Sequence, residues 1–159
     1  MGPSDEPEQA SVPQALGRLR VALDDAYLTA SREVGLTAQQ AELLCAAMRP
    51  STVGGLAVEL RCDRSNVTRL VERAARRGLV RRRGDTADGR VTMIELTAAG
   101  RRVAERFIAR LEDQTRPLIA RWDEGRRWTA SQILGEIADA LDASRDETRP
   151  GHRRRRPDR

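Results

Sequence analysis

The feature that most restricts the fold is a pair of short helical segments, residues 53–60 and 64–77, separated by a very short turn. Apolar residues recur in both at spacings of three and four, which predicts amphipathic helices. Cys62 and Asp63 form the turn, and aspartate is a favoured first residue of a helix. Two helices joined so closely, the second rich in arginine, are typical of a helix-turn-helix motif.

A β-hairpin is predicted directly after the second helix. Residues 79–83 and 90–96 alternate in polarity or are β-branched, and residues 84–89 between them are rich in glycine and aspartate. A β-hairpin that directly follows a helix-turn-helix is called a wing. The expected fold class is therefore mainly α (α+β), a winged helix-turn-helix with a two-stranded β wing and flanking dimerisation helices.

Amphipathic helices are predicted on both sides of this motif. One covers residues 14–32, and a second begins at a capping box formed by residues 37–40. A long helix begins after Thr97 and is expected to kink or end at Pro117. Another capping box, at residues 129–132, predicts the start of the last helix.

The domain organisation follows from these elements. The flanking helices carry apolar stripes that have no other surface to bury against, so we assign these helices to a dimer interface. The expected parts are a disordered tail (1–12), an N-terminal dimerisation helix (13–36), the winged helix-turn-helix domain (37–97), C-terminal dimerisation helices (98–144) and a basic disordered tail (145–159).

Positive charge is concentrated in the central block. All 29 cationic residues are arginines, a choice that codon bias in a GC-rich genome explains. Their positions need another reason, because residues 61–90 hold 10 arginines against 4 acidic residues. Such a block suits a polyanion, and double-stranded DNA is the expected partner.

The helix 64–77 has an apolar face and a polar face on a helical wheel. The N-terminal part of the second helix of a helix-turn-helix reaches the bases in the major groove. We therefore expect base contacts from the first two turns and phosphate contacts further along. A solvated charged face is the alternative. The base-reading candidates are Ser65, Asn66, Thr68 and Arg69, and the phosphate-binding candidates are Arg73 and Arg76.

The loop of the hairpin carries two further candidates. Arg90 is long enough to enter a narrow, electronegative minor groove without reading individual bases. Asp88 is repelled by phosphate unless it is paired, so we expect it to hold a nearby arginine. The alternative for Asp88 is an ordinary turn-forming residue.

The motifs together resemble the MarR family of bacterial winged-helix regulators. The resemblance covers about residues 37–107 and rests on Leu56-Ala, Val67-Thr-Arg-Leu-Val-Glu-Arg73, Arg77-Gly-Leu-Val-Arg-Arg82, Asp85-Thr-Ala-Asp-Gly-Arg90 and Leu96-Thr-Ala-Ala-Gly100. It implies a homodimer, usually a repressor, that binds a palindromic operator. The family's wing arginine corresponds to Arg90, its wing aspartate to Asp88, and its recognition-helix positions to residues 65–69.

One departure concerns the wing, where the family often has two arginines after the aspartate and this chain has Gly89 before Arg90. A phosphate or minor-groove contact is then missing, and Arg81, Arg82 and Arg83 are candidates to replace it. Arg82 and Arg83 are therefore counted among the expected DNA-binding residues.

The resemblance also implies a small aromatic or anionic effector, or a redox signal sensed by a cysteine. Cys62 precedes a helix among arginines, which favours a thiolate; an inert thiol is the alternative. Tyr27, Trp122 and Trp128 are candidates to line an effector cleft, or else they belong to the core. No ligand-binding residue is assigned.

The sequence lacks the components of most enzymes and metal sites. His152 is the only histidine, the two cysteines are far apart, and there is no glycine-rich phosphate-binding motif. No membrane span and no signal peptide is present, so the expected location is cytoplasmic. We expect no catalytic residue, cofactor, metal or membrane partner. The alternative function is a winged-helix adaptor that binds an acidic protein.

Overall fold

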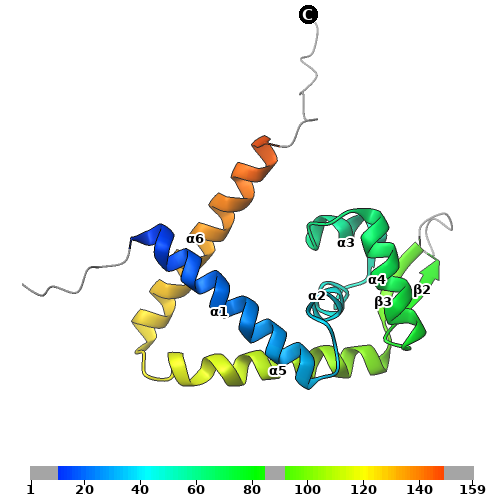
Figure 1. Ribbon diagram of the computed structural model, residues 1–159, viewed down its shortest axis with the longest axis horizontal. Coiled ribbons are helices and arrows are strands. Elements are labelled where there is room, and N and C mark those ends of the chain that lie inside the picture. Colours follow the sequence, from blue (N-terminus) through cyan, green and yellow to red (C-terminus); the bar gives the residue numbers. More distant parts are fainter. Residues whose placement is uncertain (1–10, 85–91, 149–159) are drawn as a thin grey trace, which may run out of the picture. The chain divides into compact units, whose positions relative to one another are not determined.

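The computed structural model describes residues 11–84 and 92–148 and divides into two compact units, residues 1–114 and 115–159 (Figure 1). The first unit holds five helices or parts of them and one sheet: α1 (Val12–Glu33), α2 (Ala38–Ala46), β1 (Ser51–Thr52), α3 (Val53–Glu59), α4 (Arg64–Arg76), β2 (Val80–Gly84), β3 (Thr92–Leu96) and most of α5 (Ala98–Ile119). The second unit holds the end of α5 and α6 (Glu124–Thr148).

Local hydrogen bonds set the starts of the first helices. The predicted capping box of α2 is confirmed: the Thr37 hydroxyl accepts from the Gln40 N–H at 3.2 Å, and the Thr37 N–H donates to Gln40 Oε1 at 3.1 Å. The Thr52 hydroxyl likewise accepts from the Gly55 N–H at the start of α3. Asp63 occupies the cap position of α4, but its side chain makes no capping hydrogen bond.

The sheet has three strands in the order β1-β3-β2, all antiparallel, where the sequence analysis expected only the two strands of the wing. The extra strand, β1, pairs Ser51 with Ile94 and Thr52 with Met93. A strand of two residues carries no alternating pattern, so periodicity could not detect it.

One expectation for the C-terminal helices was wrong, and one of two alternatives at Pro117 does not occur. The last helix begins at Glu124, where the Arg126 N–H donates to Asp123 Oδ1 at 2.7 Å, so the motif at residues 129–132 lies inside α6. An aspartate followed by an acidic first turn suits a helix start as well as a capping box does. Pro117 does not end α5, which continues for two residues to Ile119.

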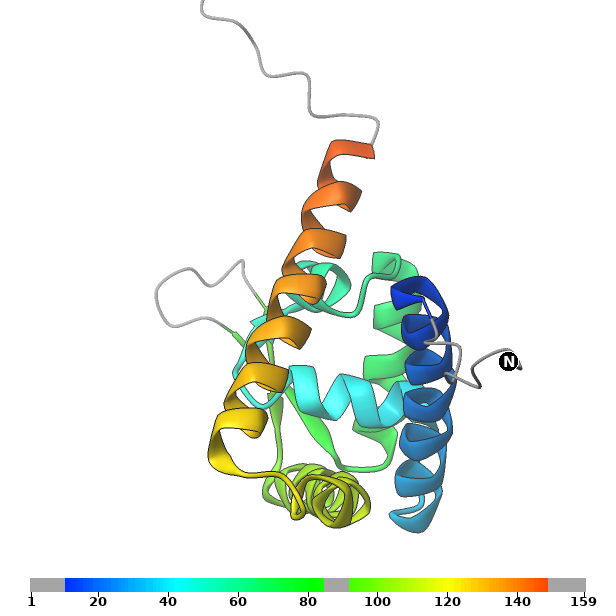
Figure 2. The same ribbon diagram turned by 90° about the vertical axis from the view of Figure 1, so that its left-hand side faces the viewer.

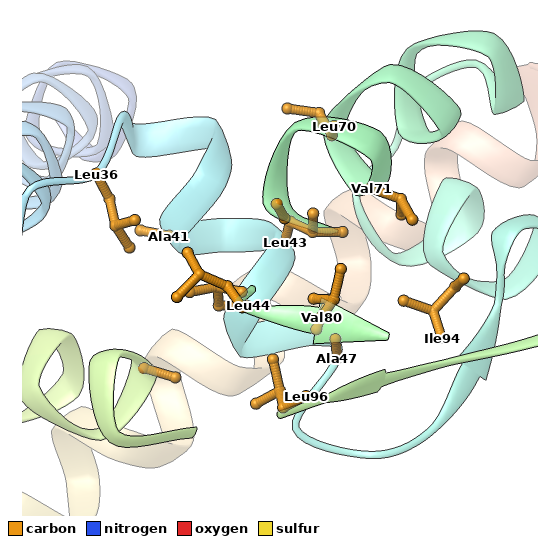
Figure 3. Packing of buried hydrophobic residues seen from close by; sticks show 14 of the residues in the cluster. Leu36, Ala41, Leu43, Leu44, Ala47, Leu70, Val71, Val80, Ile94 and Leu96 are labelled. Atoms are coloured by element: carbon orange, nitrogen blue, oxygen red, sulfur yellow. The ribbon is translucent and has the colours of Figure 1, made fainter. Parts of the chain in front are cut away.

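The core of the first unit lies where α2, α4 and the sheet meet. Leu43 and Leu44 of α2 are fully buried beside Leu70 and Val71 of α4 (Figure 3). Three residues of the hairpin close the cluster from the sheet side: Val80, Ile94 and Leu96. Burial of these side chains fixes the position of α4 relative to the sheet.

A compact junction connects the end of α4 to the start of α5. Gly78 ends α4 at φ +68°, a backbone conformation that glycine adopts without strain. The Thr97 hydroxyl donates to the Gly78 carbonyl at 2.6 Å and accepts from the Gly100 N–H at 3.0 Å, which confirms Thr97 as the cap of α5. The Thr97 N–H donates to the Leu79 carbonyl at 3.0 Å.

Gly100 is the position at which this junction tolerates no side chain. A Cβ atom there would lie 1.9 Å from the Leu79 carbonyl oxygen, which is a backbone atom that cannot move alone. We expect Gly100→Ala to lower the free energy of unfolding by about 1–3 kcal/mol, since the crowding outweighs the better helix propensity of alanine. Urea denaturation measures this change.

Gly135→Ala is the matched control, because a Cβ at Gly135 meets nothing within 4 Å. In the middle of α6 this change is expected to stabilise the helix by about 0.5–1 kcal/mol. Equal effects of the two substitutions would contradict the role of the junction.

Candidate nucleic-acid interface

The helix α4 has the two faces that the helical wheel predicted. Its inner face is buried, with Val67, Leu70, Val71 and Ala74 at most 3% exposed. Ser65, Arg69, Arg73 and Arg76 are exposed on the other side, and none of these arginines forms an ion pair with any residue in the described ranges. The polar face is therefore open to a partner.

The turn between α3 and α4 is tightened by a backbone conformation that is unusual for arginine. Arg61 has φ +53°, in the left-handed region, and the Cys62 N–H donates back to the Ala57 carbonyl at 3.1 Å. This turn fixes α3 beside α4 (Figure 1). The two helices are thus held as the helix-turn-helix that the spacing predicted.

Two of the predicted base-reading residues are only partly exposed. Asn66 and Thr68 are both half-buried at the sides of α4. The Thr68 hydroxyl donates to the Arg64 carbonyl at 2.8 Å, so its proton is used within the helix and its oxygen is left as an acceptor. Ser65 and Arg69 are the more accessible members of the group.

The hairpin register separates the three consecutive arginines of β2. Arg82 is opposite Ile94, and Val80 is opposite Leu96, so Arg82 extends from the face of the sheet that carries the core. That face is the one packed against α4. Arg82 forms no ion pair with a described residue.

The other two arginines lie on the opposite face and share one carboxylate. Glu95 is 8% exposed and accepts from Arg81 Nη2 at 3.0 Å and from Arg83 Nε at 3.1 Å. The structure therefore places Arg83, a predicted DNA-binding residue, on a different face from Arg82 and in an ion pair. No sequence pattern distinguished the two.

Arg77 is an arginine of the basic block that stabilises the fold. Its Nη1 donates to Gln40 Oε1 and its Nη2 to the Gly35 carbonyl, both at 3.0 Å. Gln40 belongs to the capping box of α2, and Gly35, at φ +73°, is in the connection before it. Arg77 therefore ties the end of α4 to the start of α2.

Sequence reasoning also passed over Arg64, the first residue of α4. It is exposed, and its guanidinium lies over Gly54 of α3, where a Cβ would come within 3.3 Å of Nη2. A cation at the first turn of a helix adds to the partial positive charge of the helix N-terminus, which makes this end favourable for an anion. The sequence signal that could have identified Arg64 is its place as the first residue of α4.

Asp88 and Arg90, the two predicted residues of the wing loop, lie outside the described residues. Within residues 11–84 and 92–148 no group of three or more acidic, histidine or cysteine side chains could hold a metal ion. No helix among them is long and apolar enough to cross a membrane.

The remaining candidates have individual environments. Cys45 and Cys62 are free thiols, each partly exposed, and burial followed by the charge of Glu42 raises the pKa of Cys45. Trp128 is 67% exposed, and the Arg126 guanidinium lies 5.0 Å from the ring centre of Trp122. Neither tryptophan is in the buried core.

Arg76 and Arg77 are adjacent but have different environments, which gives a test. We expect Arg77→Ala to lower the free energy of unfolding by about 1 kcal/mol, because it removes two hydrogen bonds between α4 and the start of α2. Arg76→Ala, which removes no such bond, is expected to change it by less than about 0.5 kcal/mol. Chemical denaturation distinguishes the two, and a larger loss for Arg76→Ala would contradict the assignment.

Comparison with known proteins agrees with this geometry. The sequence model of the MarR family matches residues 34–91, which contain α2, the helix-turn-helix and the first strand of the hairpin. No curated protein is significantly similar in sequence to the chain.

Solved structures extend the similarity beyond the matched segment. BpsR from Bordetella bronchiseptica, whose DNA binding is regulated by 6-hydroxynicotinic acid, is 24% identical, with a TM-score of 0.64 over 87% of this chain and 99% of BpsR. CouR from Rhodococcus jostii RHA1, solved with p-coumaroyl-CoA, is 23% identical, with a TM-score of 0.68 over 86% and 94%.

MarR from E. coli, solved without ligand, is 21% identical, with a TM-score of 0.64 over 82% of this chain and 98% of MarR. At these identities the structures establish the fold, and the sequence model shows the similarity of the winged segment to the MarR family. The chain therefore matches the MarR family model over residues 34–91 and shares the fold of these solved structures over most of its length.

Proposed function

We propose that the chain is a sequence-specific DNA-binding transcriptional regulator of the MarR family, a homodimeric repressor of a palindromic operator that a small molecule or a redox signal releases. The observation that carries the proposal is the outer face of α4. Ser65 and Arg69 lie exposed in its first two turns, and Arg73 and Arg76 follow on the same helix without an ion pair to a described residue.

The dimensions and chemistry of this face suit the major groove of DNA. The groove admits one α-helix, and arginine and serine side chains donate to the acceptors on its base edges. Unpaired guanidinium groups bind phosphates and release counterions. We assign Ser65, Asn66, Thr68 and Arg69 to the bases, and Arg73, Arg76 and Arg82 to phosphates, with Arg64 added to the second group. Asp88, Arg90 and Arg83 remain proposals for the wing.

Substitutions of one arginine on each face of β2 test the DNA-binding proposal. We expect Arg82→Ala to reduce the slope of log Kd against log salt by about 1, because one phosphate contact is lost. Arg81→Ala is the matched control: it removes the same charge from the opposite face, where Glu95 already pairs with it. Fluorescence anisotropy at several salt concentrations, with a duplex selected from a random pool, measures both.

Arg69→Ala is expected to weaken binding to the selected duplex by about 1–3 kcal/mol and to relax the preference at one base pair. Binding to a scrambled duplex should change much less. A wild-type protein that bound every duplex equally would contradict a sequence-specific regulator and would favour the adaptor function.

Exposed apolar side chains support the homodimer. Leu19 and Val12 of α1 are 39% and 67% exposed, and on α6 Ile133, Leu134 and Leu141 are each more than half exposed. Leaving such helix faces in water is unfavourable, and a second copy of the chain is the simplest partner for them. A two-fold axis also places two α4 helices on half-sites about one DNA turn apart.

Leu134→Asp tests the dimer, because a charge in a buried interface must be desolvated. We expect the dimer dissociation constant to rise about tenfold or more. Val58→Asp is the control, since Val58 of α3 is 69% exposed and belongs to neither dimer helix. Sedimentation equilibrium measures both variants; an unchanged dimer in Leu134→Asp would place the interface elsewhere.

A further inference from the structure

Glu95 of β3 is a charged residue that the hairpin buries, although it lies on the face of the sheet that does not carry the core. It is 8% exposed and is the one charged residue buried within the described ranges. Taking a carboxylate out of water is unfavourable unless cations and hydrogen bonds compensate for it. The partners of Glu95 must therefore account for its burial.

Two arginines of β2 surround the Glu95 carboxylate. The strands β2 and β3 lie side by side (Figure 1 and Figure 2), with Arg81 directly opposite Glu95 and Arg83 diagonal to it. Arg81 donates from Nε and Nη2 to Glu95 Oε2, at 3.2 and 3.0 Å, and Arg83 donates from Nε to Oε1 at 3.1 Å. Two guanidinium groups and one carboxylate leave this outer face of the hairpin with a net charge of +1.

Stability alone gives little reason for a carboxylate at this position. The side chains of Arg81 and Arg83 are 64% and 59% exposed, and ion pairs with such exposed partners contribute little. A β-branched residue in the place of Glu95 would suit a strand without the cost of desolvating a charge. The clearer effect of Glu95 is on the charge of the outer face, which would be +2 without it.

The inner face of the same strand carries the arginine that we assign to a phosphate. Arg82 extends from the face that packs against α4 and has no ion pair with a described residue. Phosphate contacts set the orientation of a protein on DNA without reading the sequence. Free arginines on both faces of β2 would therefore hold the protein on DNA in two orientations, and in the second of them α4 would not face the groove.

We propose that Glu95 is a positioning residue that determines specificity, because it keeps the outer face of the hairpin from becoming a second surface for DNA phosphates. It acts through Arg81 and Arg83, whose donors it occupies, and it makes no contact with DNA itself. Arg83 pairs through Nε alone and keeps its terminal amino groups for the wing contact proposed above. The inference rests on the proposed function, since it concerns the choice between one DNA sequence and all others.

Glu95→Gln tests this role, because glutamine keeps the size of the side chain and removes its charge. Fluorescence anisotropy of the full chain is measured with the selected duplex and with a scrambled duplex at several salt concentrations. At about 0.1 M salt, binding to the scrambled duplex is expected to tighten about five- to tenfold, and its salt slope to steepen by about 1, since one more cation meets phosphate. Binding to the selected duplex, in which α4 occupies the groove, is expected to tighten less than about twofold.

Glu105→Gln is the matched control. Glu105 of α5 is exposed and makes no ion pair with a described residue, so the same loss of charge frees no arginine, and the preference between the duplexes is expected to stay unchanged. Arg81→Ala added to Glu95→Gln returns the outer face to its original charge and is expected to restore wild-type binding of the scrambled duplex. Glu95→Thr, with a residue that suits a strand, is a second variant with the same expected result as Glu95→Gln.

Three results would overturn the role of Glu95: no tighter binding of the scrambled duplex by either Glu95 variant, an equal effect of Glu105→Gln, or no reversal by Arg81→Ala. Circular dichroism checks that the variants are folded. Equal binding of both duplexes by the wild type refutes the proposed function, and the role of Glu95 in specificity with it. A preference of the wild type that both Glu95 variants retain in full refutes this inference alone.

Discussion

The relative positions of α4, the hairpin and α5 depend on the hydrogen bonds between Thr97 and the backbone of Gly78 and Leu79. They join the end of α4, the base of the hairpin and the start of α5 at one place, and Gly100 lets the helix approach the Leu79 carbonyl. Without that approach, β2 and β3 would leave α4 at another angle and the arginines of both elements would diverge. A small polar contact therefore positions a much larger charged surface.

The arginines of the basic block fall into two classes that composition cannot separate. Arg69, Arg73, Arg76 and Arg82 are exposed without an ion pair to described residues, whereas Arg77 and the Arg81–Glu95–Arg83 cluster hold the protein's own elements together. The guanidinium group serves both purposes because its several donors suit a carbonyl or a carboxylate as well as a phosphate. Only the backbone register and the tertiary contacts assign each residue.

Elements with a strong local pattern were predictable. The two faces of α4, the capping box at Thr37 and the helix cap at Thr97 follow from spacing and side-chain chemistry, and the structure confirms them. β1 has two residues and depends on pairing with β3, so nothing local revealed it. The ion pairs of Glu95 and the hydrogen bonds of Arg77 are equally non-local, which is why Arg83 was grouped with Arg82 and Arg77 was left without a role.

The short strand β1 changes how the wing relates to the helix-turn-helix. Its Ser51 and Thr52 pair with β3 and are followed at once by α3, so the wing sheet and the first helix of the motif share a backbone connection. A tilt of the hairpin is therefore passed to α3 through the main-chain hydrogen bonds between β3 and β1. The sheet and the helix-turn-helix therefore form one mechanical piece, and in the proposed regulator a change in operator spacing would be met by moving this piece as a whole.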